Sequence, residues 1–318
     1  MFTRVLVPLA AVLLALTAGG SLSPEGRATT PGPNGLIVYN ELVGGDHALF
    51  TIRPDGTEKR RIVYVKGSDA EYPDWSPDGR KIVFQLDTKN DRRGCRIALV
   101  NADGTGLTNL SRGIHGCDGQ PAFTANSRRI VLGRYDDKIG AECLWSMNLR
   151  GGDRRTITPC KGFGPTDPNV SPNGKWVTYV HIKDEEKRLL ALYAVRPNGA
   201  GRRRLVPAAW SIAIKHDWSP DGKLIVLTRN GYGTPGKSAN LVTIRPDGSG
   251  ARQLTQYAGG STNAVAGSFS PDSKQIVFRL EEDGKHALAV IDRDGGKLRL
   301  LTEFGPDRPR NIDWGTHP

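Results

Sequence analysis

The chain has 318 residues, and its 44 Lys and Arg against 33 Asp and Glu give a formal net charge of +11. Its 39 Gly and 21 Pro follow no regular period, which excludes collagen, and a hydrophobic share of 37% excludes general disorder. Only two Met among so many turn-forming residues argue against a helical bundle. The positive charge suggests an anionic partner without showing one.

The N-terminus has the layout of an export signal. Arg4 is the only charge before Glu25, and an apolar stretch over residues 5–18 is followed by small residues at 19–21. The stretch is short for a membrane span, which needs about 20 apolar residues. We therefore predict a signal peptide over residues 1–20, a flexible tether over 21–33 and one folded domain over 34–318. An uncleaved anchor is the alternative.

Two turn signatures recur six times each. The first is best preserved as Trp-Ser-Pro-Asp-Gly at Trp75–Gly79 and Trp218–Gly222. Its leading apolar residues lie 45 to 51 positions apart, at Trp75, Phe123, Val170, Trp218, Phe269 and Trp314. The second signature is a turn whose glycines are Gly56, Gly104, Gly151, Gly199, Gly248 and Gly295. Pro, Asp or Asn, and Gly are the residues that tight turns require, so each repeat contains two turns.

Short apolar segments rich in β-branched residues lie between these turns, as at Ile82–Phe84 and Ile276–Phe278. They do not alternate with polar residues, so both faces of each strand are expected to be buried. Four strands in each unit of about 48 residues, repeated six times, predict an all-β fold, a six-bladed β-propeller of four-stranded antiparallel blades. Residues 311–314 supply the strand that the first unit lacks, so the C-terminal strand is expected to close the ring.

The Trp-Ser-Pro-Asp-Gly turn, the Ile-Val-Phe strand and the Asp-Gly turn resemble the WD40-like (PD40) propeller repeats of the TolB family. The resemblance covers about residues 34–316. It implies the propeller fold and a bacterial cell-envelope setting, but propellers of this kind serve many roles. TolB-like proteins also carry a separate N-terminal α/β domain, and the short stretch between the signal and the first blade departs from that pattern.

The four cysteines are Cys95, Cys117, Cys143 and Cys160. An even number in an exported chain favours disulfides over a metal site. Three pairings are possible in principle. The blade register places two cysteines at equivalent starts of a third strand and two in the connections that follow, which favours Cys95–Cys117 and Cys143–Cys160.

Polar residues end the innermost strands, one position before each leading apolar residue. Sixfold geometry gathers Asp74, Asn169, Asp217 and Asp313 around the ring axis. Carboxylate and amide oxygens are ligands for Ca²⁺, so Asp74, Asp217 and Asp313 are candidate metal ligands, although no cofactor is required. Alternatively, each Asp accepts hydrogen bonds from its own turn. His216 is the one inner-strand histidine and completes the predicted binding site at the channel mouth.

These observations predict a secreted, periplasmic or envelope-associated binding module, monomeric and without catalysis, for a protein or an anionic envelope polymer. The first residues of the outermost strands are basic, which either protects exposed edges or attracts such a polymer. No nucleic acid is expected, and no later apolar run suggests a membrane span. The alternative is a propeller-type lyase or hydrolase acting on an extracellular polysaccharide or peptide, in which His216 and Asp217 would be tested first.

Overall fold

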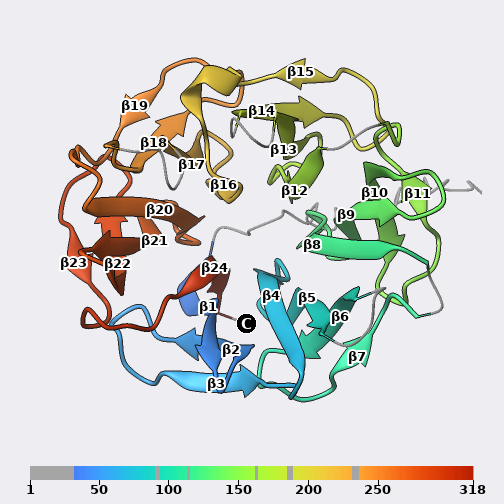
Figure 1. The fold of residues 1–318 in the computed structure, drawn as a ribbon, viewed down its shortest axis with the longest axis horizontal. Helices are drawn as coiled ribbons and strands as arrows, with labels where there is room; N and C mark the ends of the chain where they lie inside the picture. The colour runs from blue at the N-terminus through green and yellow to red at the C-terminus, as the bar shows by residue number, and fades with distance from the viewer. Residues whose placement is uncertain are drawn as a thin grey trace, which may run out of the picture.

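The computed structural model describes residues 32–89, 94–112, 115–161, 164–184, 189–230 and 236–317. Six antiparallel sheets of four strands surround a central axis, which confirms the predicted propeller (Figure 1). The predicted signal peptide and nearly all of the tether lie outside the described residues. Within those residues, no helix is long and apolar enough to cross a membrane.

Each blade contributes one strand to each of four concentric positions. The innermost strands, from blade 1 to blade 6, are β24 (Arg310–Thr316), β4 (Ser68–Trp75), β8 (Cys117–Phe123), β12 (Pro165–Val170), β16 (His216–Trp218) and β20 (Thr262–Phe269). The second strands are β1 (Asn34–Val43), β5 (Lys81–Thr88), β9 (Arg129–Asp136), β13 (Val177–Asp184), β17 (Ile225–Arg229) and β21 (Gln275–Glu282). The third strands are β2 (Asp46–Ile52), β6 (Cys95–Asn101), β10 (Ala141–Asn148), β14 (Leu189–Val195), β18 (Asn240–Ile244) and β22 (Lys285–Asp292). The outermost strands are β3 (Arg60–Val63), β7 (Thr108–Asn109), β11 (Arg155–Thr156), β15 (Arg203–Arg204), β19 (Arg252–Gln253) and β23 (Arg299–Leu300).

The last strand of the chain completes the first blade, as predicted. β24 pairs antiparallel with β1, in a register that sets Ile37 opposite Trp314. The Trp314 indole Nε1 donates to the Gly35 carbonyl oxygen at 3.1 Å. The blue and red ends of the chain therefore lie side by side in one sheet (Figure 1).

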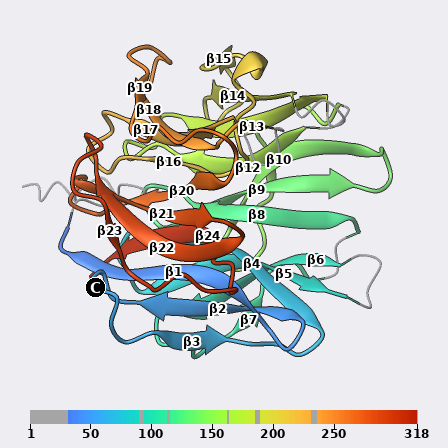
Figure 2. The ribbon, with the colours of Figure 1, turned by 60° about the vertical axis from the view of Figure 1, so that its left-hand side comes forward.

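The hydrophobic core is divided among the seams between blades. Six clusters of buried side chains are found among the described residues, and each joins strands of two neighbouring blades. Each second strand has buried side chains on both of its faces, and these pack into the seams on the two sides of its blade. Ile82, Val83 and Phe84 of β5 are fully buried, as the lack of alternation predicted. In a view turned by 60°, the strands of successive blades lie in layers (Figure 2).

The outer part of each seam depends on the second turn signature. Gly151 has φ +81°, and a Cβ there would lie 2.0 Å from the Leu110 carbonyl oxygen of the preceding blade. The same close approach recurs at the other signature glycines, where the added Cβ would meet a carbonyl oxygen of the preceding blade at 2.3 to 3.0 Å. Glycine is therefore needed at this turn for its conformation and for its lack of a side chain.

Arginines of the outermost strands join the same seams. Each of four guanidinium groups donates to a backbone carbonyl in the Gly turn of the next blade. The pairs, with their nitrogen–oxygen distances, are Arg60 with Asp103 at 3.1 Å, Arg203 with Pro246 at 3.1 Å, Arg252 with Asp294 at 2.7 Å and Arg299 with Pro54 at 2.8 Å. Part of the predicted basic strip therefore holds neighbouring blades together.

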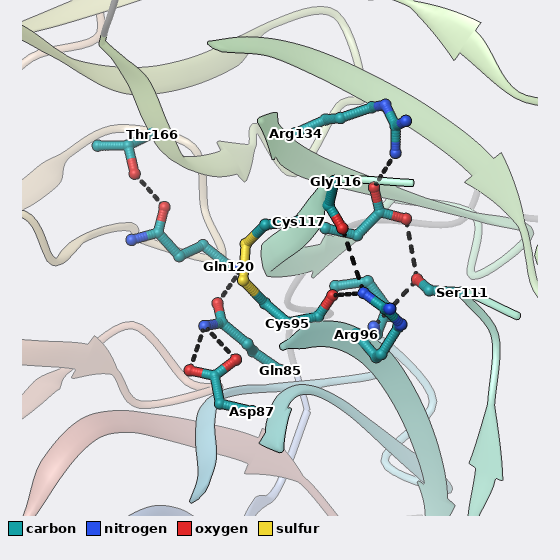
Figure 3. The surroundings of a disulfide bond; sticks show 12 residues. Gln85, Asp87, Cys95, Arg96, Ser111, Gly116, Cys117, Gln120, Arg134 and Thr166 are labelled. Carbon is teal, nitrogen blue, oxygen red and sulfur yellow. Dashed lines mark hydrogen bonds and ion pairs between the residues drawn. A yellow bond between two sulfur atoms is a disulfide. The ribbon is translucent and has the colours of Figure 1, made fainter. Parts of the chain in front are cut away.

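The predicted disulfides form. Cys95 pairs with Cys117 and Cys143 with Cys160, with Cα–Cα distances of 4.7 and 4.5 Å. Each ties the start of a third strand to the connection or innermost strand that follows. Around the first, Arg96 donates to the Gly116 carbonyl at 3.2 Å (Figure 3).

Two local features were not predicted from the sequence. Most of the outermost strands are only two residues long, as in β19 (Arg252–Gln253). A short 3-10 helix, η1 (Ala208–Trp210), lies in the connection from blade 4 to blade 5. This connection turns into the central channel, where it forms part of the candidate site.

Candidate functional site

The three inner aspartates connect neighbouring blades. The second carboxylate oxygen of Asp313 accepts from the Trp75 backbone N–H at 2.8 Å, and that of Asp74 accepts from Phe123 at 2.7 Å. Asp217 accepts from the Phe269 backbone N–H at 2.9 Å. Each partner is the leading residue of the next blade. The expectation that each Asp serves its own turn is therefore wrong. In five of the turns, that role is filled by the Asp or Asn inside the turn, namely Asp78, Asn126, Asn173, Asp221 and Asp272.

A ring of residues missed by the sequence analysis lies two positions before these aspartates. Four of them have positive φ of 48° to 50°, at Tyr72, Gln120, Asp167 and Asn311. The innermost strands β4, β8 and β12 are bulged here, which redirects the side chains. We call the equivalent positions of the six blades the bulge ring: Asn311, Tyr72, Gln120, Asp167, Lys215 and Ala266. The one sequence signal was a proline directly after three of them, at Pro73, Pro121 and Pro168.

Lys215 of the bulge ring places a positive charge among the inner carboxylates. Burial acts to lower the pKa of this ammonium group. The charges of Asp313, Asp167, Asp217 and Asp74 outweigh burial, so that the pKa is raised above its ordinary value. Lys215 is therefore the internal counter-ion of the predicted aspartate cluster.

The same environment also raises the pKa values of two of the aspartates. Burial, and then the charge of Asp313, raises the pKa of Asp74 well above its usual range. The same two causes raise the pKa of Asp217 to about 6, although Lys215 counteracts them. For Asp74 and Asp217, the charge of Lys215 therefore does not offset burial and the neighbouring carboxylate.

The carboxylates of the predicted Ca²⁺ site are already engaged by other groups of the protein. Asp74, Asp217 and Asp313 each use one oxygen for a backbone N–H, and Lys215 supplies a positive charge among them. No group of three His, Cys, Asp or Glu side chains among the described residues is arranged to hold a metal ion. Ca²⁺ binding stays a prediction, and the ammonium group of Lys215 competes with Ca²⁺ for the negative charge of these carboxylates.

His216 and Asn169 also serve the blade 4–5 seam. His216 is fully buried, with Nδ1 3.1 Å from the Asp167 carboxylate and Nε2 2.9 Å from the Thr178 hydroxyl. Asn169 donates from Nδ2 to Asp217 at 3.2 Å. With both ring nitrogens engaged and no exposed surface, His216 has the features of a seam residue rather than of a group that meets a ligand.

Side-chain amides link the bulge ring to its neighbours. The Gln120 backbone N–H donates to Gln85 Oε1 at 2.9 Å, and Gln85 Nε2 donates to the Asp87 carboxylate (Figure 3). The Gln120 side chain in turn accepts from the Thr166 hydroxyl and from the Asp167 N–H, the latter at 2.8 Å. This chain of hydrogen bonds runs across three blades and fixes the rim of the channel.

A funnel opens at the channel mouth, on the face that carries the connections between blades. Its cavity is about 470 Å³, within the usual range of ligand pockets. Much of its wall is provided by residues 211–215, in the connection leading into β16, and by residues 308–312, at the end of the last connection and the start of β24. Tyr72 and Lys215 belong both to the funnel and to the narrower space around Asp74 beneath it. The funnel is therefore the surface through which a ligand reaches the predicted site.

Two acidic side chains near the turn between β1 and β2, on this face, form ion pairs with lysines. Lys59 contacts Glu41 at 2.6 Å, and Lys89 contacts Asp46 at 2.8 Å. In both pairs the lysine is partly exposed, and ion pairs at the surface add little stability while they lower the net charge available to a partner. This turn is therefore a weaker candidate surface than the funnel.

No protein-family model matches the chain. A protein of Agrobacterium fabrum described as uncharacterized is 24% identical over 270 residues, which are 80% of this chain and 83% of that protein. The Tol-Pal system protein TolB of Anaeromyxobacter dehalogenans is 26% identical over 211 residues. That match covers 66% of this chain but only 44% of TolB, so the chain spans less than half of that relative.

Solved structures share the fold. TolB of Acinetobacter baumannii has a TM-score of 0.71 at 19% identity, covering 89% of this chain and 67% of that one. An oligogalacturonate lyase in complex with manganese has a TM-score of 0.59 at 12% identity, covering 86% and 76%. Identities this low establish the fold alone. Together with the repeats, they make the chain a TolB-like β-propeller repeat protein.

Proposed function

We propose that the chain is an exported, non-enzymatic binding module whose channel mouth holds a protein or an anionic polymer of the cell envelope. The observation that carries the proposal is the funnel, a ligand-sized cavity at the channel mouth. A hydrogen bond from Arg279 of blade 6 to the Pro309 carbonyl oxygen joins its wall to the segment that closes the ring. Two disulfides support export, because such bonds persist in oxidising compartments.

The absence of accessible catalytic machinery at His216 supports a binding role over the lyase or hydrolase alternative. The histidine is fully buried between Asp167 and Thr178. The likeness to oligogalacturonate lyase is a likeness of fold and brings no residue roles to this chain.

The test is capture from envelope extract on the immobilised protein, compared among three forms. Tyr72→Ala changes the funnel floor, whereas Arg204→Gln removes an exposed charge on β15 and serves as the matched control. We expect wild type and Arg204→Gln to retain the same species and Tyr72→Ala to lose it. Equal retention by all three forms, or turnover of galacturonate oligomers by wild type, would contradict the proposal.

A further inference from the structure

We propose that a groove between blades 3 and 4 binds an acidic segment of a partner protein, with one aromatic side chain of that segment inserted between the blades. The groove opens on the face of the ring that carries the two turn signatures, opposite the funnel. It is therefore a second site. Three departures of these two blades from the pattern of the others create it.

The first departure is the size of one leading residue. In five blades this residue is Trp or Phe and is packed in the seam with the preceding blade, whereas blade 4 has Val170 there. Beside Val170 lies the groove, a cavity of about 610 Å³. A cavity at the equivalent place between blades 1 and 2, lined by Trp75, Trp314 and Gly315, is only about 10 Å³. Blade 4 therefore leaves room where blade 2 places a ring.

The second departure leaves the outer end of the same seam open. In four other seams, an arginine at the start of the outermost strand donates to the turn of the next blade. The equivalent Arg155 donates instead to the Asp153 carboxylate of its own blade, from Nε at 3.1 Å and from Nη2 at 3.0 Å. Arg155 and Pro197 of the next blade both line the groove. The groove therefore extends from Val170 outward to β11.

The third departure removes acids from the turns that flank the groove. The first turn carries Asp in blades 2, 5 and 6, but Asn126 and Asn173 in blades 3 and 4, and both Asn residues line the groove. Each uses Oδ1 to accept a backbone N–H of its own turn, at 3.1 and 3.0 Å. Their Nδ2 groups are hydrogen-bond donors where the other turns have a second carboxylate oxygen.

Lys175, beside Asn173, shows the consequence. The equivalent lysines of blades 5 and 6, Lys223 and Lys274, lie 4.0 and 3.9 Å from the carboxylate of their own turn. Lys175 is exposed, as is Arg128 in the facing turn, and neither forms an ion pair with any residue that the structure describes. Both charges are therefore available to a ligand.

Neighbouring acids do not offset these charges. The turns and outermost strands of blades 3 and 4 on this face are fully described, over residues 124–131, 146–158, 170–177 and 195–206. They hold ten Lys and Arg against one acid, Asp153, which is paired with Arg129 and Arg155. Of the ten, Arg154 contacts the buried Asp118 of the innermost strand at 2.8 Å. This face of the two blades therefore carries a surplus of positive charge.

An acidic segment with an aromatic side chain matches both properties of the groove. Its carboxylates would meet the exposed cations and the amide donors, in charge-assisted hydrogen bonds. Its ring would lie over Val131, Val170 and Val177, which form an almost fully buried apolar floor, and beside the guanidinium group of Arg155. Guanidinium groups pack favourably against ring faces. An anionic polymer without rings would use the charges and leave the space between the blades unfilled.

Calorimetric titration of the whole protein with three synthetic peptides tests the inference. They are acetylated amides of sequence Asp-Asp-Trp-Asp-Asp, of Asp-Asp-Ala-Asp-Asp, which lacks the ring, and of Asn-Asn-Trp-Asn-Asn, which lacks the charge. We expect the first to bind roughly tenfold more tightly than either of the others, because ring burial and charge pairing each contribute about that factor. Its binding should weaken as salt is added.

Variants that restore the pattern of the other blades locate the site. Val170→Trp, as in blades 2 and 5, should fill the groove and abolish the difference between the Trp and Ala peptides. If it fails to fold, Val170→Phe, as in blades 3 and 6, provides the same comparison. Asn126→Asp combined with Asn173→Asp should weaken binding of the first peptide about tenfold, because two negative charges return to the rim. Asp272→Asn makes the reverse change in blade 6 and is the matched control, which should leave binding unchanged.

Equal binding of the Trp and Ala peptides to wild type would mean that charge alone is recognised, as in a site for a polyanion, and would overturn the inference. So would the absence of binding of the Trp peptide at millimolar concentration. Binding that is unaffected both by Val170→Trp and by the paired Asn→Asp changes would place the peptide elsewhere and overturn it too.

Discussion

At the scale of single residues, the channel is held by carboxylates that each serve two purposes. Asp74, Asp217 and Asp313 accept a backbone N–H from the following blade, and together they surround Lys215 with negative charge. A buried N–H without an acceptor costs about 1–3 kcal/mol. Like charges gathered in a buried site also cost stability, so the lysine is what makes this arrangement tolerable.

Replacing Lys215 by Met should therefore give a pH-dependent loss of stability. The pKa values of Asp74 and Asp217 are already raised in the folded state, so the folded form binds protons more tightly than the unfolded form. The stabilisation that comes from this proton binding is complete below the pKa of about 4 that an Asp has in the unfolded chain. It is lost as the pH rises through the pKa in the folded state, which is about 6 for Asp217. Without the lysine charge these pKa values rise further.

We expect Lys215→Met to cost about 2 kcal/mol at pH 8, less than the 3–5 kcal/mol of a fully buried pair, and much less at pH 5. Urea unfolding at both pH values measures this. Asp74→Asn in the same background should recover part of the loss, because Asn keeps an acceptor for the Phe123 N–H. Ca²⁺ should raise the melting temperature of Lys215→Met more than that of wild type. A loss independent of pH would refute the counter-ion role.

The sequence predicted part of this site and missed the rest for a physical reason. Asp74, Asp217 and Asp313 could be found because they keep a fixed distance from the leading apolar residue of each repeat. The bulge ring has six different residue types, so no repeated letter marks it. The direction of Tyr72 or Asn311 follows from positive φ at a bulge, which a single sequence does not reveal.

At the scale of elements, the seam between blades explains both turn glycines and outer arginines. The Gly turn of one blade lies so close to the outer part of the preceding blade that there is no room for a Cβ on the glycine. An arginine on the outermost strand of that preceding blade donates a hydrogen bond to the same turn. The apolar strands could be predicted because their composition and period are set by burial. The outer strands, mostly two residues long, could not be delimited in the sequence, because their exposed edge is not marked by a buried apolar segment.

Gly151→Ala tests the seam. The Cβ would meet the Leu110 carbonyl oxygen at 2.0 Å, and the φ of +81° is unfavourable for Ala. We expect a loss of about 3 kcal/mol in the free energy of unfolding, measured by urea titration. Gly140→Ala is the matched control, since φ is also positive at +59° but no atom lies within 4 Å. It should cost only about 1 kcal/mol. Similar losses for both would mean that backbone conformation, and not the seam, requires glycine.

At the scale of the whole molecule, stability depends on closing the ring. Every seam is a core shared by two blades, so an open ring would expose two apolar faces at once. β24 prevents this exposure. Its Trp314 and Ile312 side chains are buried in the seam with blade 6, and its Asp313 carboxylate accepts a hydrogen bond from the Trp75 backbone N–H of blade 2. One short strand at the end of the chain thus joins three blades.

Ending the chain at Pro309 should therefore do far more damage than the loss of nine residues suggests. Two seams, the Asp313 acceptor and a wall of the funnel disappear together, so we expect loss of the single cooperative unfolding transition, measured by calorimetry. Ending the chain at Thr316 is the control. It keeps β24 and removes the contact between the His317 N–H and the Pro33 carbonyl oxygen, and it should unfold within a few degrees of wild type. The shorter form could instead unfold cooperatively near the wild-type temperature. That result would mean that the ring does not depend on closure by β24 and that the contacts of the turn glycines and outer arginines between blades are enough to hold it together.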